Sequence, residues 1–132
     1  MEKWIIKPAK SVGKIYFGMR RTEIRNMFGD YKEFKKSKYS QNTTDDFGMF
    51  HVFYSKDNQC EAVEIFGDIQ LKLDTKIAFP GIYSDITSIL MSNDDNIEIE
   101  KDGFISKKLS IGIYATDDRV ESILIGEEGY YE

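Results

Sequence analysis

The segment Lys14–Ile24, KIYFGMRRTEI, is followed 62 residues later by Lys76–Ile86, KIAFPGIYSDI. At that offset a lysine, an isoleucine and a phenylalanine recur in the same places, and a hydroxyl residue followed by an acidic residue recurs before the final isoleucine. Further along, Ser55–Ile65 matches Ala115–Ile125 at an offset of 60. Two matched blocks in the same order favour a duplicated unit of about 60 residues, and chance likeness between two amphipathic patterns is the alternative.

The duplication predicts the domain organisation. Residues 1–132 are expected to form one domain, with repeat 1 covering about 12–67 and repeat 2 about 74–126. One helix on a small sheet buries little apolar area, so a unit of this size is marginally stable alone. We therefore expect an α+β fold in which two tandem helix-plus-antiparallel-sheet repeats share one core or one extended sheet.

A short helix is expected near the start of each repeat. In repeat 1, Ile24, Met27 and Phe28 have the i, i+3, i+4 spacing of one helix face, and Gly29 follows as a stop. Thr22, with an acidic neighbour, suits the helix start, because a hydroxyl can accept a hydrogen bond from a free amide there. The same spacing of apolar residues recurs 62 residues later.

Runs rich in β-branched and aromatic residues predict antiparallel strands after each helix. The expected strands are Tyr31–Lys35, Met49–Tyr54, Cys60–Phe66, Gln70–Leu73, a hairpin over 97–103, Leu109–Ile113 and Val120–Ile125. Turn residues separate neighbouring strands at 55–58 and at 116–118. The polar segment Lys36–Asp46 is long and predicts a mobile loop.

The charge is unevenly distributed along the chain. The net charge is −5, but residues 1–66 carry 12 Lys and Arg against 9 Asp and Glu, whereas residues 67–132 carry 6 against 14. An acidic chain binds phosphate backbones poorly, so we expect no nucleic-acid partner. No apolar run approaches the roughly 20 residues of a membrane span, and residues 1–10 lack the apolar core of a signal peptide. We expect a cytoplasmic protein with no membrane partner.

No arrangement of residues indicates catalysis. His51 is the only histidine and Cys60 the only cysteine, and both lie in apolar runs that predict a half-buried histidine and a buried, unreactive thiol. Acidic pairs such as Asp45-Asp46 are typical of solvated turns, and the basic run Lys32–Lys38 is typical of a solvated strand edge. The sequence has no calcium-loop spacing and no glycine-rich phosphate motif. We expect no metal, no cofactor and no enzymatic activity; an enzyme with a pocket hidden from the sequence is an alternative.

Parts of the chain resemble known bacterial families. Residues 13–29, GKIYFGMRRTEIRNMFG, resemble the opening of SmpA/OmlA-like units and depart from that pattern at Arg20. The matching residues are Gly18, Met19, Glu23, Ile24, Met27, Phe28 and Gly29. Such units are similar in fold to the tandem repeats of the β-lactamase inhibitor protein. With Phe53-Tyr54 shortly before Asp57 and GYYE at its end, the chain also looks like small bacterial proteins, several of which resemble immunity proteins encoded beside contact-dependent or other polymorphic toxins.

The resemblance implies a protein that binds a cognate toxin domain and neutralises it by occlusion, acting as a monomer when free. A basic nuclease is the expected toxin, because an acidic inhibitor can cover a surface built to hold phosphates. The candidate contacts, expected to lie in one region, are Asp94, Asp95, Asp117, Asp118, Glu127, Glu128, Tyr130 and Tyr131. Packing of the terminal tyrosines within the fold is an alternative. The alternative function is an orphan SmpA/OmlA-like structural or assembly-binding module without a toxin partner.

Overall fold

The computed structural model describes residues 2–132. Within them lie two helices, α1 (Arg21–Phe28) and α2 (Tyr83–Met91), and thirteen strands in two sheets. Strands account for 47% of the chain and helices for 13%. The fold is therefore mainly β, although it keeps the expected mixture of helices and antiparallel strands.

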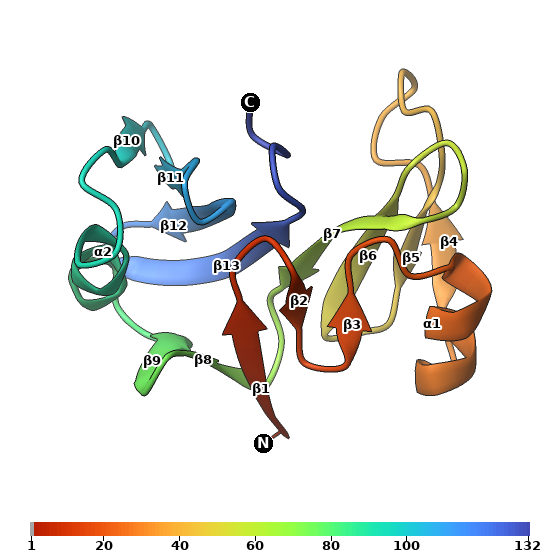
Figure 1. Cartoon of the computed structure of the whole chain (residues 1–132), viewed down its shortest axis with the longest axis horizontal. Coiled ribbons are helices and arrows are strands. Elements are labelled where there is room, and N and C mark those ends of the chain that lie inside the picture. Colours follow the sequence, from red (N-terminus) through yellow and green to blue (C-terminus); the bar gives the residue numbers. More distant parts are fainter. Residues whose placement is uncertain (1) are drawn as a thin grey trace.

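The larger sheet has eight antiparallel strands in the order β10-β11-β12-β13-β7-β6-β5-β4 (Figure 1). Its first four-stranded meander consists of β4 (Lys32–Phe34), β5 (Thr44–Asp46), β6 (Phe50–Tyr54) and β7 (Cys60–Ile65). Its second consists of β10 (Glu98–Glu100), β11 (Gly103–Ser106), β12 (Ile111–Thr116) and β13 (Arg119–Gly126). The meanders join where β7 pairs with β13, with Val63 opposite Ile125. One extended sheet therefore spans both halves of the chain.

The smaller sheet and the two helices cover one face of the larger sheet (Figure 1). Its strand order is β3-β2-β1-β8-β9. These strands are β1 (Glu2–Lys7), β2 (Ser11–Val12), β3 (Ile15–Tyr16), β8 (Ile69–Leu73) and β9 (Lys76–Phe79). Figure 1 shows α1 and α2 at opposite ends of the molecule, with the C-terminus on the other side of the larger sheet from β1.

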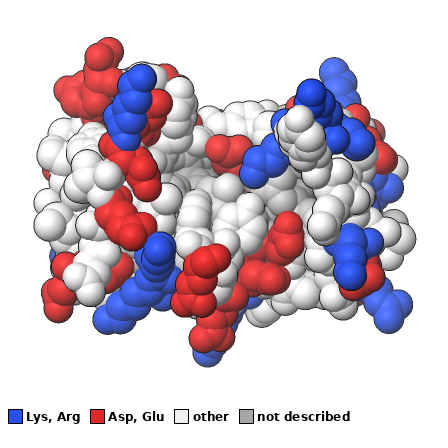
Figure 2. Space-filling view, turned by 90° about the horizontal axis from the view of Figure 1, so that it is seen from above, with Lys and Arg blue, Asp and Glu red and all other residues white. Residues whose placement is uncertain are grey.

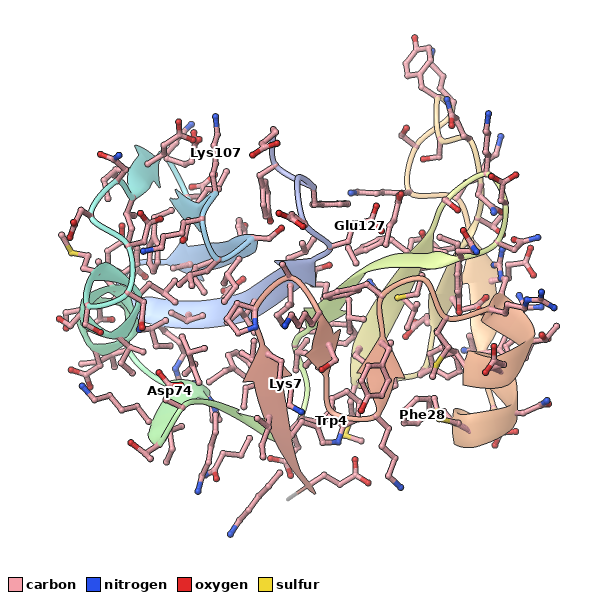
Figure 3. The ribbon with its side chains drawn as sticks, in the orientation of Figure 1. Trp4, Lys7, Phe28, Asp74, Lys107 and Glu127 are labelled. Atoms are coloured by element: carbon pink, nitrogen blue, oxygen red, sulfur yellow. The ribbon has the colours of Figure 1, made fainter. Side chains whose placement is uncertain are left out.

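The hydrophobic core lies between the two sheets and follows the alternation of the strands. In β1, Trp4 and Ile6 are buried while Ile5 between them is exposed. The Trp4 ring lies 5.0 Å from that of Phe50 in β6 and 5.8 Å from that of Phe28 in α1, so three elements meet at this point (Figure 3). Burying one such side chain contributes about 1.5–3 kcal/mol. β1 was not among the strands expected from the sequence.

Both helices have their N-cap two residues earlier than the hydroxyl pattern predicts, at Arg20 and Ile82, and neither N-cap side chain makes a capping hydrogen bond. Their first amides donate instead to turns of the larger sheet. The Arg21 amide bonds the Asn58 carbonyl at 3.0 Å, and the Tyr83 amide bonds the Asp118 carbonyl at 2.7 Å. A backbone acceptor from another part of the chain thus takes the place of the expected Thr22 hydroxyl.

The packed face of α1 also differs from the expectation. Ile24 is buried and Phe28 packs against the core, but Met27 is 41% exposed. Arg21, one turn before Ile24, is buried instead. Gly29 ends the helix as expected, with φ 75°, and its amide bonds the Arg25 carbonyl.

Corresponding contacts recur in the two halves. The isolated bridges Arg20–Gln59 and Ile82–Arg119 are related by 62 residues on one side and 60 on the other, as the matched sequence blocks are. The helix-start hydrogen bonds described above follow the same offsets. Each half therefore joins its helix to its last hairpin in the same way.

The expected loop Lys36–Asp46 is wrong at its end, because residues 44–46 form β5. Asp45 faces the core and is fully buried, contrary to the expected solvated turn. Two arginines of α1 explain this position, since both reach the Asp45 carboxylate. The strand was not predicted because its residues are polar, and the charge of Asp45 is balanced by arginines from another part of the chain. The basic run that starts at Lys32 does begin in an edge strand, β4, as expected.

Candidate functional site

The larger sheet presents one face away from the smaller sheet and the helices, and we call it the open face. Strand register places a single row of residues across all eight strands of this face. The row is Lys32, Asp46, His51, Glu64, Leu124, Gly112, Ile105 and Glu98. It is ionisable in the first meander, apolar or small at Leu124, Gly112 and Ile105 of the second, and ionisable again at Glu98 on the edge strand β10. Seen from above, this side of the molecule is hollowed in the middle (Figure 2).

The C-terminal residues lie on the open face. A Cβ atom added to Gly126 would lie 2.7 Å from the Cβ of Tyr130, and one added to Gly112 would overlap the Tyr131 hydroxyl. The two tyrosine rings pack edge to face at 5.3 Å. Both side chains are half-buried. Tyr130 therefore packs against Gly126 and Tyr131 against Gly112, and each side chain remains partly exposed.

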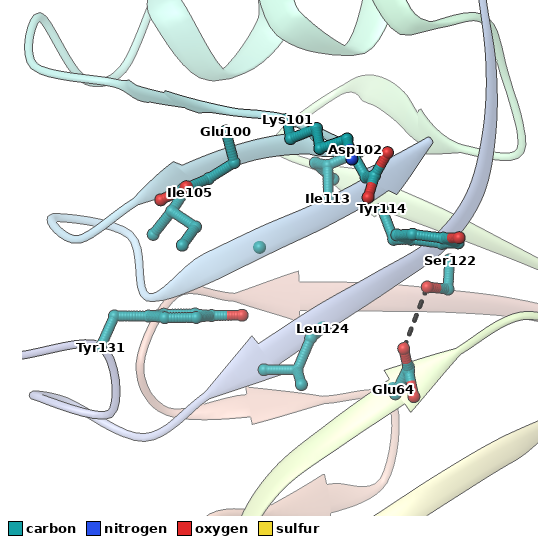
Figure 4. Close-up of a pocket in the computed structure, with 12 residues that line it drawn as sticks. Glu64, Glu100, Lys101, Asp102, Ile105, Ile113, Tyr114, Ser122, Leu124 and Tyr131 are labelled. Atoms are coloured by element: carbon teal, nitrogen blue, oxygen red, sulfur yellow. Dashed lines mark hydrogen bonds between the residues drawn. The ribbon is translucent and has the colours of Figure 1, made fainter. Parts of the chain in front are cut away.

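A hollow of 390 Å³, which we call the acidic hollow, opens beside Tyr131 (Figure 4). Its lining comes from β7, from the second meander and from the C-terminal segment. The lining residues are Glu64, Glu100, Lys101, Asp102, Gly103, Ile105, Gly112, Ile113, Tyr114, Ser122, Leu124 and Tyr131. The Ser122 hydroxyl donates to Glu64 at 3.0 Å across the joint between the meanders. Of this group, sequence reasoning predicted only Tyr131 as a contact, because the other members are brought together by strand register.

Charge divides along the open face. In Figure 2, acidic side chains predominate at the end of the β10–β11 hairpin and in the middle, and basic ones gather at the opposite end. Glu98, Glu100 and Asp102 are exposed at the first end, and Lys36 and Lys38 at the second. The charge difference between the halves of the sequence thus appears as a difference between two ends of one surface.

His51 lies in the central row between two carboxylates. Its Nε2 is 3.6 Å from Asp46 Oδ1 and its Nδ1 is 3.7 Å from Glu64 Oε1. The ring packs edge to face against Phe66 at 4.6 Å and Phe34 at 5.0 Å. The expected half-buried strand histidine is confirmed, and each of its ring nitrogens faces a carboxylate.

Cys60 is unsuited to nucleophilic chemistry. It is fully buried in β7, as expected. Burial, with smaller contributions from the nearby Glu127 and Glu61, raises the pKa of its thiol to about 12, so the thiol stays protonated at neutral pH. Among residues 2–132, no three His, Cys, Asp or Glu side chains come together in a way that could hold a metal ion.

The acidic residues predicted as contacts do not lie in one region. Asp117 and Asp118 form the turn before β13, whereas Glu127 and Glu128 follow its end, so eight residues of strand, roughly 25 Å, separate the pairs. Figure 3 shows Glu127 near the middle of the molecule. The expectation of a common acidic region failed because the pairs mark opposite ends of a strand.

Asp94 differs from its neighbour Asp95. It is buried and accepts hydrogen bonds from the Ser106 hydroxyl at 2.7 Å and from the Asn96 amide at 2.9 Å. These bonds lower the pKa of its carboxyl. Asp94 therefore fixes the loop after α2, while Asp95 is exposed.

A buried ionic cluster around Asp45 is the most tightly bonded group outside the hollow. Arg21 Nη2 lies 2.9 Å and Arg25 Nη2 2.8 Å from Asp45 Oδ1, and the Tyr54 hydroxyl donates to Oδ2 at 2.9 Å. Burial raises the pKa of Asp45, but the hydrogen bonds from Arg25 and Arg21 outweigh it and the pKa is lowered. Arginines four residues apart on one helix face were the available sequence signal. The donors of Arg21 are used within the cluster, which supports a structural role.

Within residues 2–132, neither helix is long and apolar enough to cross a membrane. Comparisons of the chain with protein-family models, with curated proteins and with solved structures find no match. The resemblance to SmpA/OmlA-like units and to immunity proteins therefore stays a prediction.

Proposed function

We propose that the chain is a cytoplasmic immunity protein that binds a cognate toxin domain through the open face and neutralises it by occlusion. The toxin is proposed to be a basic nuclease and the free protein a monomer. The observation that carries the proposal is the open face itself, a hollowed sheet surface with an acidic end. A concave surface can cover the convex surface of a partner, and its carboxylates favour a basic one.

The chemistry of the open face supports binding over catalysis. Its only histidine lies between two carboxylates, and the only thiol is buried on the opposite side of the sheet. Half-buried Tyr130 and Tyr131 offer aromatic area that is already ordered by packing, which reduces the entropy cost of binding. Exposed acids beside them would steer a basic partner toward the face.

We also propose that the two halves arose from one duplicated unit. The corresponding bridges and helix-start hydrogen bonds support this origin, because their offsets equal those of the matched sequence blocks. A duplicated meander would place two similar half-sheets side by side and so produce the width of the open face.

Co-expression with the protein encoded directly upstream tests the function. If that protein carries the toxin, its expression alone should stop growth, and co-expression with this chain should restore it. The two should also elute as one complex in size-exclusion chromatography. A toxic upstream protein that neither binds this chain nor is neutralised by it would reject the proposal and leave the assembly-module alternative.

Charge reversal tests whether the toxin contacts the acids of the open face or the acidic residues predicted from the sequence. The triple variant Glu98→Lys, Glu100→Lys, Asp102→Lys should slow association with the toxin about tenfold at low salt and reduce its salt dependence. The control is Asp117→Lys with Asp118→Lys, which changes exposed acids at the far end of β13. Stopped-flow binding should show a much smaller change for the control; equal effects would remove the open face as the contact.

A further inference from the structure

Two of the positions that line the acidic hollow are glycines of the open face. Strand pairing places Gly112 between Ile105 and Leu124, and Gly103 next to Tyr114. A Cβ on Gly103 would overlap the backbone carbonyl of Ile113, so the geometry there excludes any other residue. At Gly112 the place of a side chain is taken by the Tyr131 hydroxyl. The hollow is a depression beside that ring, and its floor, which includes Ile105 and Leu124, is apolar.

Two tyrosines stand on either side of this depression (Figure 4). Tyr131 reaches in from the C-terminal segment, and Tyr114, which is 45% exposed, stands on β12. Their rings present flat apolar surfaces toward an occupant. Burial raises the pKa of Tyr131, with smaller contributions from Tyr130 and from the negative charge of Glu64, so its hydroxyl stays protonated.

Carboxylates exceed ammonium groups around the hollow. Glu64, Glu100 and Asp102 line it, against Lys101 alone. Among residues 2–132, neither Glu100 nor Asp102 takes part in an ion pair. Figure 4 places these two on one side and Glu64 on the other. The hollow therefore offers acceptors for a cation on opposite walls.

We propose that the acidic hollow receives an arginine side chain of the partner protein. The inference rests on the proposed function for the identity of that partner. Arginine fits better than lysine, because a planar guanidinium can lie against the tyrosine rings while its five N–H donors reach carboxylates on both sides. Its aliphatic stem can lie on Leu124 and Ile105.

A small arginine mimic tests the hollow without the partner. The ¹⁵N-labelled chain is titrated with Nα-acetyl-arginine N-methylamide, and amide shifts are followed by NMR. Saturable shifts should concentrate at the floor, on Gly103, Gly112 and Leu124. The citrulline analogue, which has nearly the same shape but no charge, should bind about tenfold more weakly or worse.

Matched variants locate the binding. Glu100→Gln with Asp102→Asn should weaken arginine-mimic binding about tenfold, while Glu128→Gln, an exposed acid outside the hollow, should leave it unchanged. Tyr131→Ala should also weaken it, since the variant removes one wall. The ¹⁵N spectrum of each variant shows whether the fold is retained, and Tyr131→Ala keeps the test available if the double variant misfolds.

Equal binding of the arginine and citrulline mimics, or shifts confined to other surfaces, would overturn the inference. That result together with an intact toxin complex would leave the proposed function standing. Selective arginine binding without any toxin complex would support a guanidinium site and reject the immunity role. The two proposals can therefore fail separately.

Discussion

Equivalent positions in the two halves are filled by an ion pair in one and by an aromatic pair in the other. Arg21 and Tyr83 are the first residues of α1 and α2, 62 positions apart. Their partners, Asp45 and Phe104, also occupy corresponding positions. Asp45 lies opposite Val52 in the pair β5–β6, and Phe104 lies opposite Ile113 in the pair β11–β12. Arg21 bonds Asp45, whereas the Tyr83 ring packs edge to face on Phe104 at 5.2 Å.

A third position also differs between the halves, with a polar side chain in the first and an apolar one in the second. Tyr54, which donates to Asp45, pairs with Cys60, and Ala115 pairs with Val120 at the corresponding place. The first half therefore holds its helix by directional bonds to a buried charge, and the second by shape and apolar contact. The backbone arrangement tolerates both solutions, but they should fail differently when a residue is removed.

Removing the buried carboxylate should cause the largest loss. In Asp45→Ala, two arginines and the Tyr54 hydroxyl lose their common acceptor, and an uncompensated buried charge costs about 3–5 kcal/mol. Urea unfolding followed by circular dichroism measures this loss. The control Glu33→Ala removes an exposed acid from the same cluster and should have a much smaller effect. Equal losses would mean that burial of Asp45 does not determine the strength of the cluster.

Acid should weaken the first half through the same residue. The pKa of Asp45 is lowered in the folded protein, so its contribution is complete above the unfolded value of about 3.9 and is lost as pH falls through the folded pKa. At pH 7, Asp45→Asn should be about 1.5–3 kcal/mol less stable than the wild type. Urea unfolding at several pH values from 7 to 2 should show this gap closing toward low pH; a constant gap would exclude the charge as its cause.

The difference between apolar and ionic packing also explains which elements could be predicted from the sequence. Apolar periodicity predicted β6, β7, β12, β13 and both helices, because local spacing determines which face is buried. It missed β5, since Thr44, Asp45 and Asp46 are polar and only α1 makes burial possible. It also missed the short strands β2 and β3, whose two residues each show no period.

The acidic hollow could not be predicted from local sequence patterns, because it is formed by residues that are far apart in the chain. Glu64 and Leu124 are 60 residues apart and become neighbours through the pairing of β7 with β13. Gly112 in an apolar run predicted nothing by itself, because its role depends on Tyr131 lying above it. Pairing between meanders and the path of the C-terminal segment cannot be read from local spacing, so the hollow required the structure.

In the second half, trimming the aromatic pair should cost less than removing the charge. Phe104→Leu leaves a small cavity beside Tyr83 and should lower the free energy of unfolding by about 1–2 kcal/mol, with no dependence on pH. Phe66→Leu serves as the control, because that ring is 37% exposed. If the loss in Phe104→Leu varied with pH as that of Asp45→Asn does, the contrast between the halves would not hold.

The smallest effect is expected where the C-terminal segment meets the sheet. The Cβ of Gly112→Ala would overlap the Tyr131 hydroxyl, so Tyr131 must move away while the strand itself remains intact. The stability should change by less than about 1 kcal/mol, because only a half-buried terminal ring is displaced. Amide hydrogen exchange at residues 127–132 should nevertheless become faster.

A double-mutant cycle then assigns that change to one contact. In a Tyr131→Ala background there is no hydroxyl to displace, so adding Gly112→Ala should leave exchange in the C-terminal segment unaltered. An equal acceleration in both backgrounds would mean that the alanine disturbs β12 rather than the tyrosine. Tyr131 keeps its position by packing against the Tyr130 ring and by the absence of a Cβ at Gly112. Asp45 in the first half is instead held by hydrogen bonds from three residues, Arg21, Arg25 and Tyr54.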